Sequence, residues 1–240
     1  MTGPSAVVVV HQDKDAMAQA TAARLIAAVA DAQIARGTAS VVLTGGRNGI
    51  GLLAALAASP ARSTVNWARL DLWWGDERFL PDGDPDRNHT QARAALLDAV
   101  PLDPARVHPM PPSDAAASPE AAAEAYAAEL AAAAGPFDVL LLGVGPDTHV
   151  ASLFPGHPAL EETDRAVVAV HDAPKPPPVR VSLTVPTIRS AREVWLLAAG
   201  EDKAKAVATA LSGADTSAPA ARVHGTERTL WLVDEAAAPA

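Results

Sequence analysis

Short apolar runs rich in β-branched residues alternate with long alanine-rich segments, and this alternation limits the possible folds of the chain more than any other feature. The first apolar runs stand at 6–10, 40–44, 70–74 and 137–143. Continuous runs of this kind are typical of strands buried on both faces of a mostly parallel sheet. The segments between them predict helices over 13–36, 48–58, 88–100 and 119–134.

The second half of the chain continues the pattern. Strand-like runs follow at 165–170, 179–185, 193–200 and 229–234, with a helix beginning near Glu201. The alternation predicts an α/β fold with a doubly wound, mostly parallel, Rossmann-like sheet flanked by helices. We expect a single domain over residues 1–240. The proline-rich pieces at 108–114 and 173–180 are closely bracketed by predicted elements, so we interpret them as rigid surface connections.

The composition favours a small-molecule partner. The 240 residues are 49% hydrophobic, enough for a sizeable core, and carry a net charge of −9. An acidic chain is a poor general binder of nucleic acid or of acidic membranes, although a local basic pocket can still hold an anion. Cysteine is absent, which excludes a cysteine nucleophile and thiolate metal sites and fits a cytoplasmic enzyme. The apolar run at 7–10 is too short for a signal peptide or a membrane span.

The stretch TGGRNGIG at 44–51 looks like the glycine loop of short-chain dehydrogenases. A glycine loop between a strand and a helix presents backbone N–H groups and the positive end of the helix dipole to an anion, whatever the ligand is. The candidates for such binding are Thr44, Gly45, Gly46, Arg47 and Asn48.

Three observations disfavour a dinucleotide cofactor. The loop follows the second predicted strand, whereas the dehydrogenase loop follows the first. The only tyrosine, Tyr126, is followed by Leu130 where the dehydrogenase pair Tyr-x-x-x-Lys requires a lysine. In LGVGPDTH, Thr148 stands where a Rossmann fingerprint has its third glycine.

Titratable residues follow the strand at 137–143. Asp147 and His149 come just after a Gly-Val-Gly-Pro turn, and ligands of open α/β sheets bind beyond the carboxyl ends of strands. Histidine is a natural proton shuttle because it titrates near neutral pH. Taken alone, His149 could instead pack against the turn, and Asp147 could cap a helix.

A similar junction follows the strand at 70–74. Arg78 offers a planar fork for a phosphate or an oxyanion, but Asp76 and Glu77 beside it also fit a surface ion-pair cluster. The three junctions, after Thr44, Trp74 and Gly143, all carry glycine and polar residues. We expect them to converge at one edge of the sheet.

The longer blocks resemble the successive motifs of the 6-phosphogluconolactonases. The blocks that carry the resemblance are LDLWWGDERFLP, DRNHTQAR, FDVLLLGVGPDTHVASLFPGHP and RVSLTVPTIRSAREVWLLAAGEDKAKAV. They run in order from about residue 40 to the LWLVDEAAA segment, nearly the whole chain. The resemblance implies a sugar-phosphate isomerase-like α/β fold. It also implies hydrolysis of 6-phospho-D-glucono-1,5-lactone, a step of the oxidative pentose phosphate pathway, without a metal or an organic cofactor.

The resemblance also assigns roles to individual residues. It implies that His149 is the general base and later the general acid. Arg78 and the glycine-loop N–H groups are candidates to bind either the oxyanion or hydroxyl groups of the substrate. The resemblance nominates Arg180 and Lys203 for the substrate phosphate, and Asp147 to orient the loop or the histidine. Without the motif, Lys203 would be interpreted as a solvated surface lysine.

This chain departs from the family pattern at two places. The usual S-G-G-S-T-P loop carries Arg47 and Asn48 here, so a guanidinium and an amide replace hydroxyl groups. Thr148 replaces the glycine before the motif histidine, and we expect it to restrict the turn that aims His149.

Two other functions are open. A glucosamine-6-phosphate deaminase or isomerase would show A-F-N-E-P where this chain has 151–155, and D-E-Y where it has 76–78. A non-catalytic sugar-phosphate-binding regulator would need a DNA-binding extension, and no helix-turn-helix extension fits within this acidic sequence of 240 residues. A metal site is not expected, because H-E-x-x-H is absent and His149 and His157 flank a proline-broken loop. The expected partner is a phosphorylated sugar lactone, bound by a monomer or a weak homo-oligomer.

Overall fold

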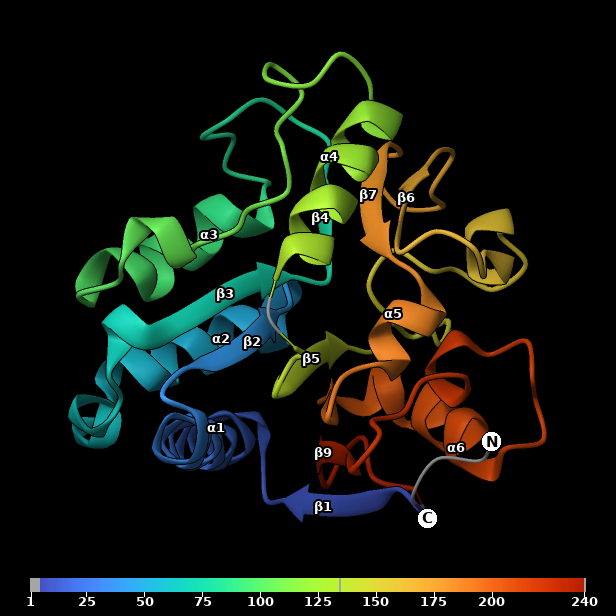
Figure 1. Cartoon of the computed structure of the whole chain (residues 1–240). Coiled ribbons are helices and arrows are strands. Elements are labelled where there is room, and N and C mark those ends of the chain that lie inside the picture. Colours follow the sequence, from blue (N-terminus) through green and yellow to red (C-terminus); the bar gives the residue numbers. More distant parts are fainter. Residues whose placement is uncertain (1–4, 134, 240) are drawn as a thin grey trace.

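A six-stranded parallel sheet forms the centre of the molecule (Figure 1). The computed structural model describes residues 5–133 and 135–239. In spatial order the strands are β1 (Val7–His11), β9 (Arg228–Asp234), β8 (Glu193–Ala198), β5 (Val139–Gly143), β2 (Ala39–Leu43) and β3 (Leu70–Trp74). Each neighbouring pair is parallel, so the predicted doubly wound α/β fold is confirmed.

Helices cover both faces of this sheet. One face packs against α1 (Lys14–Arg36), α2 (Gly46–Ala58) and α3 (Asn88–Ala95). The other packs against α4 (Pro119–Ala132), α5 (Val185–Arg189) and α6 (Ala204–Ser212). Short 3-10 helices cover Pro60–Thr64, Trp67–Arg69, Leu97–Ala99, Pro104–Arg106, Pro158–Glu161, Glu201–Lys203 and Pro219–Ala221. Within the described residues, no helix is both long enough and apolar enough to cross a bilayer.

The apolar runs form strands because both of their faces are buried. On β2, Val41 and Leu43 face the α1–α2 layer while Val42 faces the opposite layer. On β8, Trp195 and Leu196 divide in the same way. Successive side chains of a strand point to opposite faces, so a strand covered on both sides needs apolar residues at every position.

A second, three-stranded sheet corrects one expectation. The runs at 165–170 and 179–185 do form strands, β6 (Val167–Val170) and β7 (Arg180–Leu183), but these do not join the parallel sheet. They pair antiparallel with each other, and β4 (Asp76–Arg78) pairs antiparallel with β7. The segment between β6 and β7 contains no helix, and a parallel pairing requires a long crossover connection.

The helix boundaries differ from the predicted ones in detail. Asp13 caps α1 by accepting a hydrogen bond from Ala16 N at 2.8 Å, and Gly37 ends it in the left-handed region, as expected. The helix predicted over 88–100 instead breaks at Leu96, whose φ is −150°. The helix expected near Glu201 begins as a 3-10 turn before α6. The predicted end at 134 lies outside the described residues.

The order of strands creates a crevice between β2 and β5. The chain passes from β2 outward to β3, and later from β5 outward in the opposite direction to β8 and β9. The β2–β5 ladder ends at Val42 and Leu140; beyond it the hydroxyl of Thr44 accepts a hydrogen bond from Gly143 N at 3.1 Å. Ligands of open α/β sheets bind where the strand order reverses in this way.

Candidate active site

A pocket of about 180 Å³ lies at the carboxyl ends of β2, β3, β5 and β8. The three predicted junctions converge there. The nominated residues that line it are Thr44, Gly45, Gly46, Arg47, Asn48, Arg78, His149, Arg180 and Lys203. Asp147 lies behind the wall, next to His149. Among the lining residues that were not nominated from the sequence, three carry polar or charged side chains: Asp76, Asn88 and Lys175.

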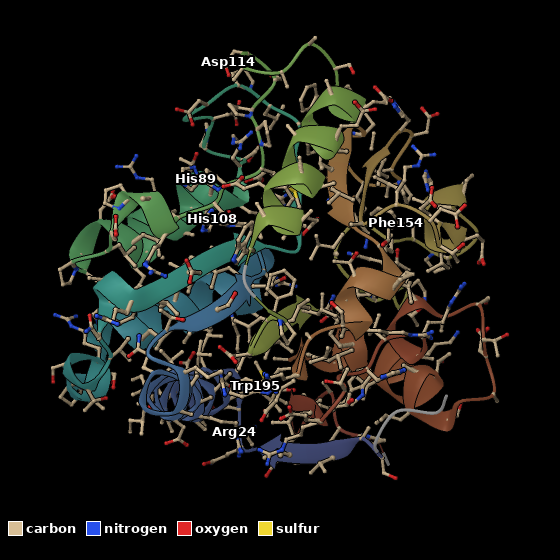
Figure 2. All side chains as sticks on the ribbon, viewed as in Figure 1. Arg24, His89, His108, Asp114, Phe154 and Trp195 are labelled. Atoms are coloured by element: carbon tan, nitrogen blue, oxygen red, sulfur yellow. The ribbon has the colours of Figure 1, made fainter. Side chains whose placement is uncertain are left out.

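His149 and Asp147 form a close pair. His149 Nδ1 lies 2.5 Å from Asp147 Oδ1, and the ring packs against Phe154 with centroids 4.7 Å apart. Phe154 lies near the ends of β6 and β7 (Figure 2). Partial burial of the Asp147 carboxyl opposes its ionisation, but hydrogen bonds and charges from His149 and Lys175 outweigh it and hold its pKa well below the usual range. The ionised carboxylate accepts a hydrogen bond from Nδ1–H, so in the neutral ring the lone pair lies on Nε2, which has no hydrogen-bond partner among the described residues.

The turn before His149 closes on itself despite Thr148. Thr148 adopts a φ of +70°, a left-handed conformation that glycine would take without strain. Thr148 N donates to Gly145 O at 3.0 Å, and Gly145 N donates to His149 O at 2.9 Å. Ala220 N holds the carbonyl of Thr148 at 3.0 Å. The expected restriction therefore does not prevent the turn; we assign it a strain of about 1–3 kcal/mol.

We predict that Gly145→Ala lowers kcat roughly 100-fold, because a catalytic group displaced by about 1 Å costs that much. A Cβ built at Gly145 would lie 1.9 Å from His149 Nδ1 and 2.5 Å from Asp147 Oδ1, so both side chains would have to move. Gly51→Ala is the matched control, since a Cβ there meets nothing within 4 Å. Steady-state kinetics measure kcat of both variants. If Gly145→Ala were as active as Gly51→Ala, the close approach of His149 and Asp147 to Gly145 would not be required for activity.

Lys175 enters the site from a segment that the sequence analysis placed on the surface. Its Nζ lies 3.1 Å from Asp147 Oδ1 and 3.2 Å from His149 Nδ1. Arg180 holds this segment through hydrogen bonds to the carbonyls of Lys175, Pro176 and Pro177. Most of 173–180 does lie at the surface, as a connection between β6 and β7, but Lys175 also lines the pocket, which the sequence analysis did not predict. A lysine in a proline-rich stretch carries no sequence signal that distinguishes it from a solvated one.

The glycine loop forms one wall. Its glycines permit close packing: a Cβ at Gly49 would lie 2.2 Å from Thr44 O, and one at Gly45 would lie 1.9 Å from Asn88 Oδ1. Arg47 stands in the first turn of α2 with an 80% exposed side chain, 3.8 Å from Asp202. The guanidinium that replaces the usual hydroxyl thus lies at the mouth of the pocket.

Glu77 anchors the part of the wall that carries Arg78 and Asn88. It is 1% exposed and accepts hydrogen bonds from the backbone N–H of Arg78 (2.8 Å), Asn88 (2.6 Å) and His89 (2.9 Å). Burial raises the pKa of its carboxyl, against the lowering effect of Arg87 and these N–H groups. Glu77 faces the buried Arg87 at 3.8 Å, and no ion pair among the described residues involves the Arg78 guanidinium. The interpretation of Arg78, Asp76 and Glu77 as a surface ion-pair cluster is therefore wrong.

The pocket is locally basic although the chain carries a net charge of −9. The cations that line it are Arg47, Arg78, Lys175, Arg180 and Lys203. The Lys203 side chain is only 12% exposed; burial, with the nearby Lys175 and Arg47 charges, lowers its pKa although Asp202 opposes this. In residues 5–133 and 135–239, no three His, Asp or Glu side chains are grouped to hold a metal ion. This arrangement suits an anionic substrate.

The model of one protein family matches most of the chain. The model for "Glucosamine-6-phosphate isomerases/6-phosphogluconolactonase" covers residues 12–231. The chain belongs to this family. Among its members, a 6-phosphogluconolactonase of Streptomyces coelicolor is 68% identical over 96% of this chain and 92% of its own. One from Mycobacterium tuberculosis is 49% identical over 98% of both chains.

Solved structures of the glucosamine-6-phosphate isomerase/6-phosphogluconolactonase family share the fold. The 6-phosphogluconolactonase from Trypanosoma brucei superposes with a TM-score of 0.84 at 30% identity, covering 98% of both chains. That from Thermotoga maritima gives 0.85 at 26% identity, covering 96% of this chain and all (100%) of its own. A monomeric glucosamine-6-phosphate deaminase gives 0.81 at 21% identity, covering 98% of both chains, which shows the fold alone.

Residues 151–155, where the lactonase and deaminase patterns differ, make contacts that support the pocket. Ser152 Oγ donates to Asp76 Oδ2 at 2.6 Å, which joins the loop after β5 to β4. Phe154 packs on the His149 ring from the same block. These are residues of ASLFP, where the deaminase pattern has A-F-N-E-P. The lactonase-type block therefore supports the walls of the pocket and the face of the histidine.

Proposed function

We propose that this protein hydrolyses 6-phospho-D-glucono-1,5-lactone to 6-phospho-D-gluconate, a step of the oxidative pentose phosphate pathway. The observation that carries the proposal is the His149–Asp147 pair, with Nε2 as a free acceptor, on a pocket lined by cations. The identity of 68% with a named 6-phosphogluconolactonase supports the same activity. The cytoplasmic location and the monomer or weak homo-oligomer stay predictions.

His149 supplies the proton chemistry of the proposed reaction. Nε2 takes a proton from a water molecule while the water oxygen forms a bond to C1 of the lactone. The tetrahedral oxyanion then collapses, the bond between C1 and the ring oxygen breaks, and that oxygen takes the proton back from Nε2 to become the C5 hydroxyl. The new carboxylic acid releases its proton to solvent. Asp147 keeps the ring in one tautomer and stabilises the transient imidazolium.

The remaining nominated residues bind the charged parts of the substrate. Arg78 and the N–H groups of the glycine loops are the candidates to stabilise the oxyanion. Arg180 and Lys203 are the candidates for the phosphate, together with the mouth residues Arg47 and Asn48. Arg78 Nη1 also donates to Asp86 O, which holds the guanidinium at the wall.

We predict that Arg180→Met raises KM for the phosphorylated lactone at least about tenfold, because charge-assisted hydrogen bonds to a phosphate are strong. Arg24→Met is the control; Arg24 lies on the exposed side of α1, far from the pocket (Figure 2). Steady-state kinetics give KM and kcat separately. A lower kcat with unchanged KM would argue against a ground-state contact between Arg180 and the phosphate. The role of Arg180 would then be limited to its hydrogen bonds to the backbone of 175–177.

The proposed function is tested by generating the lactone with glucose-6-phosphate dehydrogenase and following its hydrolysis with and without the protein. The spontaneous rate is subtracted. We expect a large acceleration; no acceleration contradicts the proposal. Release of ammonia from glucosamine 6-phosphate, measured in parallel, would instead place the protein with the deaminases, and we expect none.

A further inference from the structure

Three charged or titratable groups, those of Asp147, His149 and Lys175, meet at one point on the wall of the pocket. Asp147 Oδ1 lies 2.5 Å from His149 Nδ1 and 3.1 Å from Lys175 Nζ, and Lys175 Nζ lies 3.2 Å from the same imidazole nitrogen. The proposed mechanism uses the aspartate and the histidine but assigns nothing to the lysine. At this distance the charge of the Lys175 ammonium must affect the protonation of the His149 ring.

Asp147 and Lys175 act on His149 in opposite directions. The carboxylate favours the imidazolium, whereas the ammonium disfavours it. From β7, the Arg180 guanidinium lies over the Phe154 ring, 5.7 Å from its centroid, and the same ring lies 4.7 Å from the imidazole of His149. The other charged groups among the lining residues of the pocket are Arg47, Asp76, Arg78 and Lys203. Lys175 is the cation in hydrogen-bond range of the imidazole, so it dominates the opposing effect.

Lys175 can also meet an anion without leaving its place. Its side chain is 40% exposed and lines the pocket. An ammonium has three N–H donors; one is directed to Asp147, and at least one more is available to the pocket. Its backbone is fixed by Arg180, which donates to the carbonyls of Lys175 and Pro176 at 3.0 and 3.2 Å. The same lysine therefore faces both the general base and the space for a phosphate.

We propose that Lys175 is a positioning residue that holds His149 in its neutral, proton-accepting form and links the protonation of His149 to the binding of a phosphate dianion in the pocket. The inference rests on the proposed lactonase function only for its catalytic consequence. In the free protein the ammonium opposes proton uptake by Nε2. When a phosphate binds the ammonium, its negative charge offsets this opposition, and the imidazolium that forms during hydrolysis is stabilised.

The first test compares pH profiles of kcat/KM for the wild type, Lys175→Met and Lys175→Arg. The acid limb of the profile reports protonation of the free general base. Removal of a cation in contact with the ring favours the imidazolium, so the acid limb of Lys175→Met is expected to move to higher pH by about one unit or more. Lys175→Arg should restore the wild-type position. Lys205→Met, an exposed lysine outside the pocket, is the matched charge control and should not move the limb.

A uniform fall of kcat/KM at all pH values in Lys175→Met, with the acid limb unmoved, would overturn the proposal and leave a purely structural or phosphate-binding lysine. The second test needs no activity. The His149 ring proton is titrated by NMR, with His149→Ala for assignment, in the presence and absence of inorganic phosphate. We expect phosphate to raise the midpoint in the wild type and to have little effect in Lys175→Met.

The wild-type titration alone decides the linkage if the variants fold poorly. A midpoint that does not respond to saturating phosphate would contradict it. Failure of the proposed function is a separate result, because it would appear as absent lactone hydrolysis in the wild type while the titration could still show the linkage.

Discussion

His149→Ala is expected to lower kcat for lactone hydrolysis by roughly 100- to 10,000-fold, the range in which a positioned general base contributes. The carboxylates that remain are poor substitutes for the lone pair on Nε2: Asp147 does not line the pocket and keeps its contact with Lys175, and Asp76 accepts a hydrogen bond from Ser152. The protein should stay folded, since His149 lies in a loop and its side chain is 18% exposed. The measurement is initial rate against substrate concentration, with circular dichroism to verify the fold.

The control for this variant is His171→Ala. His171 is a half-exposed histidine that pairs with Glu120 at 2.6 Å and lies outside the pocket. Its loss should leave kcat unchanged. A normal rate in His149→Ala would overturn the assignment of the general base while leaving the lactonase function itself intact. Equal losses in both variants would indicate a general effect of the substitution rather than a lost proton acceptor.

Glu77→Ala is expected to lower the free energy of unfolding by about 3–5 kcal/mol, which is the usual cost of removing one partner of a buried ion pair. Arg87, which is 0% exposed, would lose the facing carboxylate. Three backbone N–H groups, those of Arg78, Asn88 and His89, would lose their acceptor at the same time. Urea denaturation of the wild type and the variant measures the difference.

Two further variants identify the cause of that loss. Glu77→Gln keeps the shape and one acceptor oxygen but removes the charge, so we expect an intermediate loss of stability. Glu227→Ala removes a carboxylate of the exposed Arg192–Glu227 pair and should cost at most about 1 kcal/mol. If Glu77→Ala were no more destabilising than Glu227→Ala, the buried pair would not be an anchor of the wall that carries Arg78.

The strands and helices could be predicted because their signals are local. Runs such as 139–142 are apolar at every position, and burial on both faces is the simplest physical cause. The antiparallel sheet could not be predicted in the same way. The run at 179–185 alternates apolar and polar residues, which is typical of a strand with one apolar face, but the alternation does not state which strands it pairs with. Strand direction depends on the connection and on the partners, which are remote in sequence.

The candidate site was accessible wherever glycine and polar residues follow a strand. Thr44, Arg78 and His149 each stand just beyond a strand end, and parallel strands bring those ends together. Lys175 and Asn88 gave no such signal. Lys175 lies in a proline-rich connection, and Asn88 opens α3 in a polar stretch. Each reaches the pocket through tertiary contacts: Lys175 through Arg180, Asn88 through Glu77 and Asp76.

The glycine loop at 44–51 shows what the sequence alone determines and what only the tertiary structure determines. Its position after a buried strand and before a helix, and hence its character as an anion-binding turn, follow from local backbone chemistry that the residue order alone specifies. Which groups surround that turn depends on contacts between distant segments: Asn88 against Gly45, and Lys175 beside His149. Local periodicity carries no information about such contacts, because they arise only when hydrophobic burial brings the sheet and its loops together.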